Sequence, residues 1–361
     1  MKIVHLIHSL RGGGIQNFIL SLAPEQVKTK NDVTVIVIDK YDSDYCYHLH
    51  NLLTEHNVKV IKLNKIRGSK LSLIKAIRSC QSYIKAIKPD IINTHSEIAH
   101  LYGGLISICT NTPQVITVHN APEIWNNVLK IICKNKPLIF CSQAAFKLRQ
   151  QESKLMTSID NGISRDIIHS NHVTNLRKEF NLEEDNKVII LAGSLRPQKN
   201  YHFLIDIIQN LSNNKYHFFI CGGGKIDEGN INPNDFKQYN NIHFLGLRSD
   251  VSAIENGADL FLSCAKFEGL PIAVLEAYFN GIPCVLSPIE QHKKIAGVAK
   301  VWIPNSFTGK EFVRSINEAL NCTLDHDTIY QERKKQIEYY SIERTANKYM
   351  DFYKKVIENE K

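Results

Sequence analysis

The sequence predicts an α/β protein built from two doubly wound domains, each with a parallel sheet. Short runs rich in Val and Ile alternate with segments of helical periodicity along the chain, a pattern typical of repeated βαβ units. Glycine clusters follow two of these runs, at residues 12–14 and 222–224. The apolar periodicity lapses around residues 165–185 and then restarts, which indicates two domains within 361 residues.

The elements follow one another in the same order in both halves. In the first half we expect strands near residues 2–8, 33–38, 58–62, 90–94, 114–118 and 137–141, with helices near 15–28, 46–56, 70–88, 97–109 and 123–133. In the second half we expect strands at 188–191, 216–220, 241–245, 259–263 and 283–286, again separated by helices. Residues 326–357 form a final helical segment that is polar and rich in Tyr.

The composition is that of an ordinary globular protein, with 43% hydrophobic and 22% charged residues. No apolar run approaches the ~20 residues needed to span a bilayer. The first residues, Met1 to His5, are typical of a first strand rather than of a signal peptide. The nine cysteines are scattered without a Cys-x-x-Cys pair, which favours a reducing, cytoplasmic setting.

The net charge of +8 is unevenly distributed, with +10 in residues 1–165 and −2 in the remainder. The basic first half indicates an anionic partner, such as a membrane surface or a lipid diphosphate, or else a solvated lysine-rich surface. The predicted helix at 70–88 has an apolar face and a basic face, so it is either a membrane-surface helix or a solvated one. Its basic residues are Lys70, Lys75, Arg78, Lys85 and Lys88, and its apolar residues are Leu73, Ile77, Ile84 and Ile87. The interleaved basic and aromatic motifs of nucleic-acid-binding modules are absent, so we expect no nucleic-acid partner.

The most informative segment is residues 267–287, where two carboxylates, Glu268 and Glu276, bracket a Gly-Leu-Pro turn that opens a helix. Pro271 has the fixed φ suited to the first helical position. The backbone N–H groups around Leu270 and at residues 272–274 are then expected to point outward with the positive end of the helix dipole. Such a helix start binds phosphate, and the flanking carboxylates suit the hydroxyls of a nucleotide-sugar.

This segment resembles the donor-binding signature of the family-four retaining glycosyltransferases, in which two glutamates are separated by seven residues within a GT-B fold. Further matching segments occur in the family's order at residues 11–14, 94–96, 117–120, 161–163, 192–200 and 221–225. The resemblance covers nearly the whole chain. It implies two Rossmann-like domains that face each other across a cleft. Residues 1–165 would form the acceptor-binding domain, 166–335 the nucleotide-sugar-binding domain, and 336–361 a C-terminal helix that packs back on the first domain.

The resemblance assigns roles to residues of the second domain. Lys199 would contact the donor diphosphate, Glu268 the sugar hydroxyls, and Glu276 the ribose hydroxyls as an ionised acceptor. The family commonly has an arginine at the position of Ser194, and Arg196 is the candidate for the missing cation. The loop at Leu247 and Arg248 would lie beside the nucleobase. The remaining donor-binding candidates are Gly13, Gly14, Gly223, Gly269, Leu270, Pro271 and Val274.

In the first domain the resemblance points to a glycine loop and two histidines at strand ends. Gly12, His95 and Asn120 would lie beside the acceptor, and His119 would contact the donor sugar near the reaction centre. The structural alternatives are a plain strand–helix turn for the glycines and a packing role for each histidine. For the glycines at 222–224, a Rossmann dinucleotide site is the rival interpretation, although the spacing does not match Gly-x-Gly-x-x-Gly.

We expect no metal and no cofactor. Many transferases of another fold bind a metal through an Asp-x-Asp pair, and this chain contains Asp42-Ser43-Asp44 and Asp325-His326-Asp327. Neither pair adjoins the expected donor site, so each is interpreted as a turn or a helix cap. The positive charge that neutralises the leaving diphosphate would then come from the protein.

Together these features predict a retaining, metal-independent glycosyltransferase. It would transfer a hexose or N-acetylhexosamine from a nucleotide-sugar, most readily a UDP-sugar, to a sugar hydroxyl in bacterial surface polysaccharide synthesis, with a saccharide acceptor that is free or lipid-linked. The expected location is the cytoplasm, with or without peripheral contact with the inner face of the membrane. Two alternatives stay open: a nucleotide-sugar 2-epimerase of similar fold, and a non-catalytic nucleotide-sugar-binding partner of another transferase.

Overall fold

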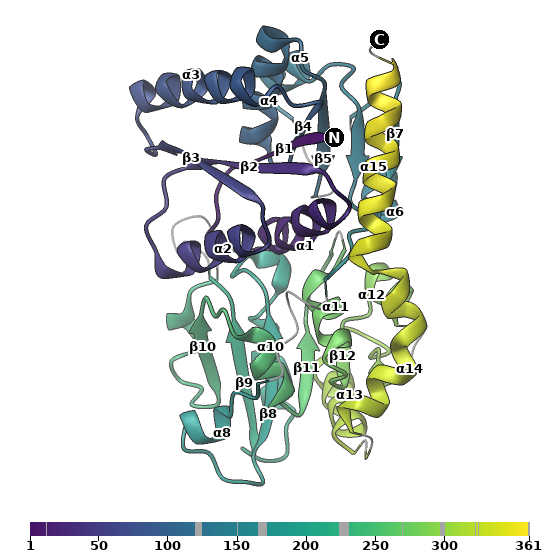
Figure 1. Ribbon diagram of the computed structural model, residues 1–361. Coiled ribbons are helices and arrows are strands. Elements are labelled where there is room, and N and C mark those ends of the chain that lie inside the picture. The colour runs from purple at the N-terminus through teal and green to yellow at the C-terminus, as the bar shows by residue number, and fades with distance from the viewer. Residues whose placement is uncertain are drawn as a thin grey trace. The chain divides into compact units, whose positions relative to one another are not determined.

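The chain folds into two compact α/β units, Met1–Ser164 with Ser341–Lys361 and Arg165–Tyr340 (Figure 1). The computed structural model describes residues 1–11, 13–119, 125–149, 151–164, 172–223, 231–268, 270–296, 300–321, 323 and 325–359. Each unit contains one parallel sheet whose strands alternate with helices along the chain. The predicted α/β class with two doubly wound domains is therefore confirmed.

The sheet of the first unit has the order β3-β2-β1-β4-β5-β6-β7. Its strands are β1 (Lys2–Ile7), β2 (Asp32–Asp39), β3 (Lys59–Lys65), β4 (Ile91–Thr94), β5 (Gln114–Val118), β6 (Leu138–Phe140) and β7 (Met156–Ser158). All neighbours pair in parallel, and Ile3 lies opposite both Val33 and Ile91. The strand order reverses between β1 and β4, and ligands of doubly wound sheets bind at the carboxyl ends of the strands beside such a point.

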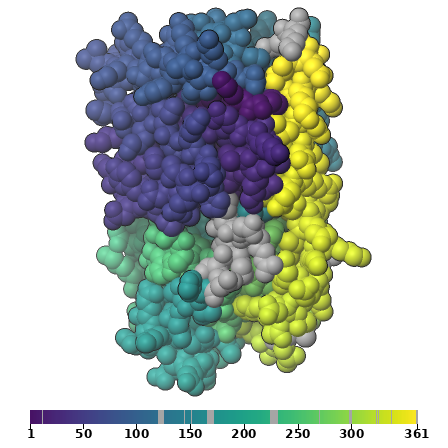
Figure 2. Space-filling view, in the orientation of Figure 1, coloured from purple at the N-terminus to yellow at the C-terminus, as the bar shows by residue number. Residues whose placement is uncertain are grey.

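Helices cover this sheet through apolar faces. They are α1 (Gly14–Lys28), α2 (Asp44–Glu55), α3 (Lys70–Ile87), α4 (Glu97–Thr110), α5 (Asn127–Ile132), α6 (Gln143–Lys147) and α15 (Ile342–Asn359). Ala76, Cys80 and Ile84 of α3 join the core formed with β1, β2, β4 and α4. The last helix, α15, packs against α1, and Figure 2 shows it in yellow directly beside the purple N-terminal part of the chain.

The sheet of the second unit has the order β10-β9-β8-β11-β12-β13. Its strands are β8 (Lys187–Ala192), β9 (Tyr216–Cys221), β10 (Ile242–Gly246), β11 (Leu260–Ser263), β12 (Cys284–Leu286) and β13 (Val301–Trp302). Its helices are α8 (Leu176–Glu179), α9 (Phe203–Gln209), α10 (Val251–Asn256), α11 (Ile272–Phe279), α12 (Glu290–Ile295), α13 (Gly309–Leu320) and α14 (His326–Tyr339), with short 3-10 helices η1 (Pro197–Lys199) and η2 (Pro233–Phe236). One core joins β8, β9, β11, α9 and α13.

The final helical segment differs from the prediction, because it consists of two helices rather than one. The break lies at Tyr340 and Ser341, where Ser341 forms an isolated parallel bridge with Ile163 and the N–H of Ile342 donates to the carbonyl of Ile163. Before the break, α14 is anchored in the second unit by Arg333, which is fully buried and donates to the carbonyls of Ile282 and Lys300. The helix that follows the break belongs to the first unit.

None of the described helices is both long enough and apolar enough to cross a bilayer. The eight cysteines in the described part of the chain are free thiols.

Candidate active site

The centre of the candidate site is an ion pair between Lys199 and Glu268. The ammonium Nζ of Lys199 lies 2.7 Å from Oε1 of Glu268, and the two side chains are 19% and 7% exposed. Lys199 ends the short helix η1 that follows β8, and Glu268 lies in the loop that follows β11. Because β8 and β11 are adjacent parallel strands, their carboxyl ends bring both loops to one edge of the sheet.

Gln198 holds these two loops together. Its carbonyl accepts from the N–H of Lys266 at 2.9 Å, and its side-chain Nε2 donates to the carbonyl of Phe267 at 2.9 Å and to Oε2 of Glu268 at 3.2 Å. Both oxygens of the Glu268 carboxylate therefore have partners. This explains how a largely buried charge is tolerated at this position.

Three glycines allow the loops beyond β8 and β9 to approach each other closely. A Cβ on Gly193, whose φ is +150°, would lie 2.7 Å from Cε of Lys199, so the lysine stem crosses directly over this residue. A Cβ on Gly222 would lie 1.8 Å from the carbonyl oxygen of Gly193, and one on Gly223 would lie 2.8 Å from Cγ of Leu247. The predicted candidates Lys199, Gly223 and Leu247 thus lie on loops that run side by side.

The start of α11 differs in detail from the prediction. Pro271 is the residue before the helix, with φ −79° and ψ 81°, and Ile272 is the first helical residue. The N–H of Ile272 donates to the carbonyl of Leu270, and the N–H of Val274 donates to the carbonyl of Pro271. These two amides therefore donate within the turn. The prediction that the N–H groups of residues 272–274 point outward to a phosphate is wrong for Ile272 and Val274.

Glu276 lies in the second turn of α11 and is buried. Its charge acts on a second carboxyl group, Glu255 of α10, which is fully buried and accepts a hydrogen bond from the side-chain amide of Asn280. Burial, and next the charge of Glu276, raise the pKa of Glu255 well above its usual range. The second unit thus holds a buried carboxyl group close enough to Glu276 to be influenced by its charge.

Arg248 is held by acidic side chains. Its guanidinium pairs with both carboxylate oxygens of Asp250, at 2.7 and 2.8 Å, and with Glu179 at 3.1 Å. Hydrogen bonds with Arg248 lower the pKa of Asp250. The guanidinium is therefore engaged by three carboxylate oxygens of the second unit, and the contact of this loop with a base stays a prediction.

The position of the expected second cation is exposed. Arg196 precedes η1, and its side chain lies on the surface, whereas its neighbour Leu195 is buried in the core. Ser194 is half-buried, and its carbonyl accepts from the N–H of Arg196. The described contacts therefore place Lys199, and not Arg196, against Glu268.

In the first unit, His95 and His119 follow β4 and β5 as predicted, and they contact each other. Nδ1 of His95 lies 3.0 Å from Nε2 of His119, and Nε2 of His95 lies 3.0 Å from Nδ1 of His5 in β1. His95 is fully buried with both ring nitrogens engaged, so the predicted contact between His95 and an acceptor is not supported. His119 is half-buried, and its ring packs edge-on against Phe18.

The glycine loop after β1 is only partly described. Gly13 caps α1 with φ +137°, a backbone conformation that residues other than glycine rarely adopt. A Cβ on Gly14 would meet nothing within 4 Å. Gly12, Asn120 and Gly269, which were predicted to line the site, lie outside the described residues.

The two Asp-x-Asp pairs lie at helix starts, as predicted. Oδ1 of Asp325 accepts from the N–H of Thr328 at the start of α14, and Ser43 caps α2 immediately before Asp44. Within the described ranges, no group of three or more His, Cys, Asp or Glu side chains is arranged to hold a metal ion.

Sequence reasoning missed several buried polar residues in each unit. His5 and Gln26 are fully buried in the first unit, and Glu255 and His292 are fully buried in the second. A histidine in the middle of the apolar run Ile3–Ile7 was a usable signal, because buried polar groups need partners. Gln198 carried no such signal, since its role depends on two loops that are 70 residues apart.

Comparison with known proteins gives two family matches in chain order. Residues 12–140 match glycosyltransferase family 4, and residues 172–341 match the glycosyl transferases group 1. The chain belongs to the group 1, family-4 glycosyltransferases. The transferase is 26% identical over 246 residues to an Escherichia coli UDP-Gal:alpha-D-GlcNAc-diphosphoundecaprenol alpha-1,3-galactosyltransferase, an alignment that covers 61% of this chain and 64% of the relative. It is 24% identical over 313 residues to the O-antigen biosynthesis glycosyltransferase WclY of Escherichia coli, with 80% of each chain covered.

Solved structures show the same fold at low sequence identity. Anabaena HepE, crystallised in complex with UDP and glucose, superposes with a TM-score of 0.76 at 18% identity, covering 97% of this transferase and 98% of HepE. This likeness confirms the predicted GT-B fold.

Proposed function

We propose that this transferase is a retaining, metal-independent enzyme that moves a hexose or N-acetylhexosamine from a UDP-sugar to a sugar hydroxyl of a growing, lipid-linked bacterial surface polysaccharide. The observation that carries the proposal is the pairing of Lys199 with Glu268 at the carboxyl edge of the second sheet. The names of the relatives support the substrate class, because one uses UDP-galactose and a diphosphoundecaprenol-linked acceptor and another acts in O-antigen synthesis.

The ion pair suggests how the donor is bound. Before binding, the charge of Lys199 is balanced by Glu268. A diphosphate is a stronger partner for an ammonium group than a carboxylate is, so Lys199 turns to the diphosphate when the donor enters. The Glu268 carboxylate then accepts hydrogen bonds from sugar hydroxyls, while Gln198 keeps its other oxygen in place.

The reaction needs negative charge to be neutralised on the leaving diphosphate. In this proposal Lys199 supplies the positive charge for the diphosphate, while Ser43 caps α2 and Asp325 accepts from the N–H of Thr328 at the start of α14. The acceptor hydroxyl attacks the anomeric carbon from the face on which the diphosphate leaves, the bond to the phosphate oxygen breaks, and that oxygen takes the acceptor's proton. Glu276 binds the ribose, and His119 contacts the transferred sugar.

A donor screen tests this proposal. The purified chain is incubated with several UDP- and GDP-sugars, with and without EDTA and without acceptor, and the products are followed by NMR. Slow release of the sugar as the α-anomer from a UDP-α-sugar, unaffected by EDTA, supports the proposal. Release of the β-anomer first, or a requirement for a divalent metal, contradicts it. Conversion to a 2-epimer of the intact nucleotide-sugar indicates the epimerase, and binding without turnover indicates a non-catalytic partner.

We also propose that α3 contacts an anionic membrane surface. Ala76, Cys80 and Ile84 face the core, but Leu71 is 82% and Ile74 49% exposed on the opposite side. From Lys65 to Lys88 the chain has seven Lys or Arg residues and no Asp or Glu. Exposed aliphatic side chains among basic residues match the boundary between acyl chains and anionic headgroups.

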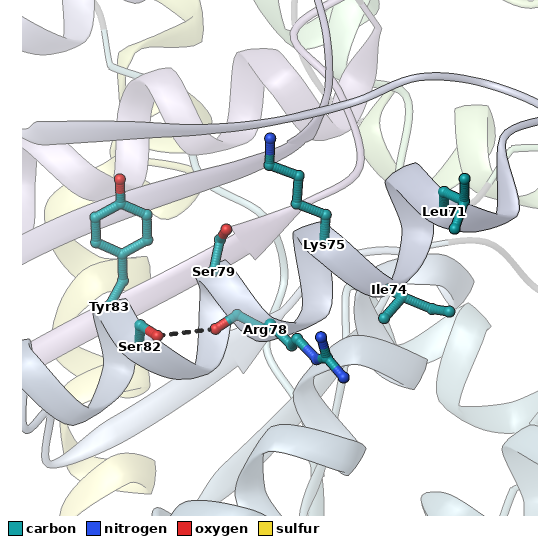
Figure 3. Close-up of a pocket in the computed structure, with 7 residues that line it drawn as sticks. All are labelled: Leu71, Ile74, Lys75, Arg78, Ser79, Ser82 and Tyr83. Atoms are coloured by element: carbon teal, nitrogen blue, oxygen red, sulfur yellow. Dashed lines mark hydrogen bonds between the residues drawn. The ribbon is translucent and has the colours of Figure 1, made fainter.

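The exposed face of α3 carries a groove between two rows of side chains. Figure 3 shows Lys75, Ser79 and Tyr83 in one row and Ile74 and Arg78 in the next, with the Ser82 hydroxyl bonded to the carbonyl of Arg78. The residues that line the groove are Leu71, Ile74, Lys75, Arg78, Ser79, Ser82 and Tyr83. The groove thus combines exposed aliphatic side chains with basic ones, the two features that a helix at a membrane surface needs.

Vesicle flotation tests this second proposal. We expect the chain to float with phosphatidylglycerol vesicles at low salt and not with phosphatidylcholine vesicles, because the basic residues require anionic headgroups. Replacing both Leu71 and Ile74 by Ser should abolish flotation, and replacing the exposed Val173 of the second unit by Ser should leave it unchanged. Equal flotation of the double variant and the native chain contradicts the assignment to α3.

A further inference from the structure

The helix α3 runs from the carboxyl edge of the first sheet to the opposite edge. Lys65, which ends β3 before the helix, donates to Asp39 at the end of β2 at 3.0 Å, and Nε2 of His8, just after β1, lies 2.9 Å from the other oxygen of Asp39. At the far end of α3, the carbonyl of Ile87 accepts from Nζ of Lys2 at the beginning of β1 at 3.4 Å. The N-terminal end of α3 therefore lies at the edge where parallel sheets bind their ligands.

Exposed aliphatic side chains are concentrated at this end of the helix. Ile66, in the loop before α3, is 58% exposed, and Leu71 and Ile74 near the start of α3 are also exposed. The loop is held in place by the N–H of Ile66, which donates to the side-chain oxygen of Ser72 at 2.7 Å. The apolar strip of Ile66, Leu71 and Ile74 is thus a fixed part of the first unit, and water covers it unless a ligand does.

Basic residues lie along the apolar strip, and all of them are exposed: Arg67, Lys70, Lys75 and Arg78. Residues 65–88 contain no Asp or Glu. Within the described ranges, none of these four basic side chains forms an ion pair with an acidic residue elsewhere in the chain. Their positive charge is therefore available to an anionic ligand.

The two kinds of side chain indicate the chemistry of the ligand. Aliphatic side chains bind a hydrocarbon chain through burial, and Arg and Lys bind phosphate oxygens. Arg67 and Lys70 lie at the end of α3 nearest to the ligand edge, which places the anionic group there. The groove runs along the helix from Leu71 to Tyr83, so a hydrocarbon chain that occupies it leads away from that edge (Figure 3).

We propose that α3 binds the prenyl diphosphate part of a lipid-linked acceptor, with the diphosphate between Arg67 and Lys70 and the prenyl chain along Leu71 and Ile74. This inference rests on the lipid-linked acceptor of the proposed function, and it assigns to α3 a defined lipid ligand in addition to a membrane surface. The saccharide joined to the diphosphate then begins at the carboxyl edge of the first sheet, where an acceptor is needed.

Isothermal titration calorimetry of the full chain with farnesyl diphosphate tests the site without a membrane. Saturating UDP is present, so that the donor site does not take up the diphosphate. We expect binding at one site that weakens as the salt concentration rises. We also expect inorganic diphosphate and farnesol each to bind at least tenfold more weakly, because each lacks one half of the ligand. Absence of farnesyl diphosphate binding, or equal affinity for either fragment, overturns the proposal.

Two pairs of charge substitutions test where the diphosphate lies. Replacing both Arg67 and Lys70 by Gln should weaken farnesyl diphosphate binding about tenfold, because two charge-assisted contacts with phosphate oxygens are lost. The matched control replaces both Lys85 and Lys88, two exposed lysines at the other end of α3, by Gln and should keep the native affinity. Equal losses in the two variants contradict the assigned position.

Two pairs of apolar substitutions test where the prenyl chain lies. Replacing both Leu71 and Ile74 by Ser should weaken binding at least tenfold, because two aliphatic side chains are no longer buried against the ligand. The matched control replaces Val128 and Ile131 of α5, which are 55% and 75% exposed, by Ser and should bind like the native chain. All the substituted side chains are exposed, so we expect the variants to fold. A native affinity in the α3 variant overturns the proposal.

These measurements separate this inference from the two proposals that precede it. Flotation with anionic vesicles in the absence of farnesyl diphosphate binding would leave the membrane contact of α3 standing and overturn the lipid site. The titrations contain no sugar donor and involve no turnover, so a failure of the lipid site and a failure of the transferase activity are seen in different experiments.

Discussion

The Lys199 ammonium lies 2.7 Å from a carboxylate oxygen of Glu268, and each side chain comes from a loop that follows one of two adjacent parallel strands. The pair is largely buried, and Gln198 donates to the second carboxylate oxygen. A buried charge pair of this kind contributes little net stability. We therefore infer that the pair serves to keep both charged groups in position for the donor. A bound donor would supply each group with a new partner, because the diphosphate pairs with the Lys199 ammonium and the sugar hydroxyls donate hydrogen bonds to the Glu268 carboxylate.

Replacing Lys199 by Met should reduce donor hydrolysis at least 100-fold, because the leaving diphosphate loses its neutralising charge. The free energy of unfolding should also fall by about 3 kcal/mol, since Glu268 remains buried without its partner. Turnover assays and urea unfolding measure both effects. The control is Lys215→Met, which removes an exposed lysine paired with Asp185. Native turnover in Lys199→Met would contradict the assigned role.

Replacing Glu276 by Gln should weaken UDP binding about tenfold, because an amide oxygen is a poorer acceptor for ribose hydroxyls than a carboxylate is. Isothermal titration calorimetry with UDP measures the change. Glu255→Gln is the matched control, since Glu255 is a buried carboxyl group near Glu276 that has no assigned contact with the ribose. Equal losses of affinity in both variants would show that the acidic pair acts as a packing unit and not through the charge of Glu276.

Stability should fall as the pH is lowered from 7 to 5, in part because of His292. This residue is fully buried, and burial lowers its pKa from 6.5 to about 4. Between these values the unfolded chain binds a proton that the folded chain does not, so the free energy of unfolding decreases with falling pH. The contribution of this histidine over the interval is roughly 1 to 2 kcal/mol.

The variant His292→Asn tests this contribution, because it keeps a polar group beside the carbonyl of Ser287 but cannot be charged. Urea unfolding at pH 7 and pH 5 should show a smaller loss of stability in the variant than in the native chain. Parallel losses in both proteins would mean that His292 does not contribute to the pH dependence.

Replacing Gly222 by Ala should disrupt the donor site through the backbone. The added Cβ would lie 1.8 Å from the carbonyl oxygen of Gly193, so the loops after β8 and β9 must separate. We expect a loss of about 2 kcal/mol or more in the free energy of unfolding, the range for overpacking a tight contact. The control for stability is Gly14→Ala, where the Cβ meets nothing within 4 Å. Thermal unfolding of the two variants compares them directly, and equal melting temperatures would refute the argument.

The order of strands and helices could be predicted because it depends on local patterns. Apolar runs and helical periodicity identified β1 to β6 and β8 to β12 within a few residues. The strands β7 and β13, with three and two residues, and the five-residue α6 are too short to show a period. The break before α15 was missed because it depends on the bridge between Ser341 and Ile163, which are remote in sequence.

The sequence indicated which residues belong to the candidate site but not which of them contact each other. Lys199, Glu268 and His119 were identified because each follows a predicted strand in a recognisable motif. The contact between Lys199 and Glu268 depends on β8 and β11 being neighbours, which the order of strands along the chain does not reveal. The ring contacts of His95 with His5 and His119 likewise require β1, β4 and β5 to be adjacent.

The helix α15 has a consequence for how the chain is made. It supplies Tyr349, Tyr353 and Val356, all fully buried, to a unit whose other elements end at residue 164. During synthesis the ribosome must therefore translate the entire second unit before the first can close its hydrophobic interior. An isolated fragment of residues 1–164 would lack these side chains, and a stable version of it would need residues 341–359 joined back through a linker.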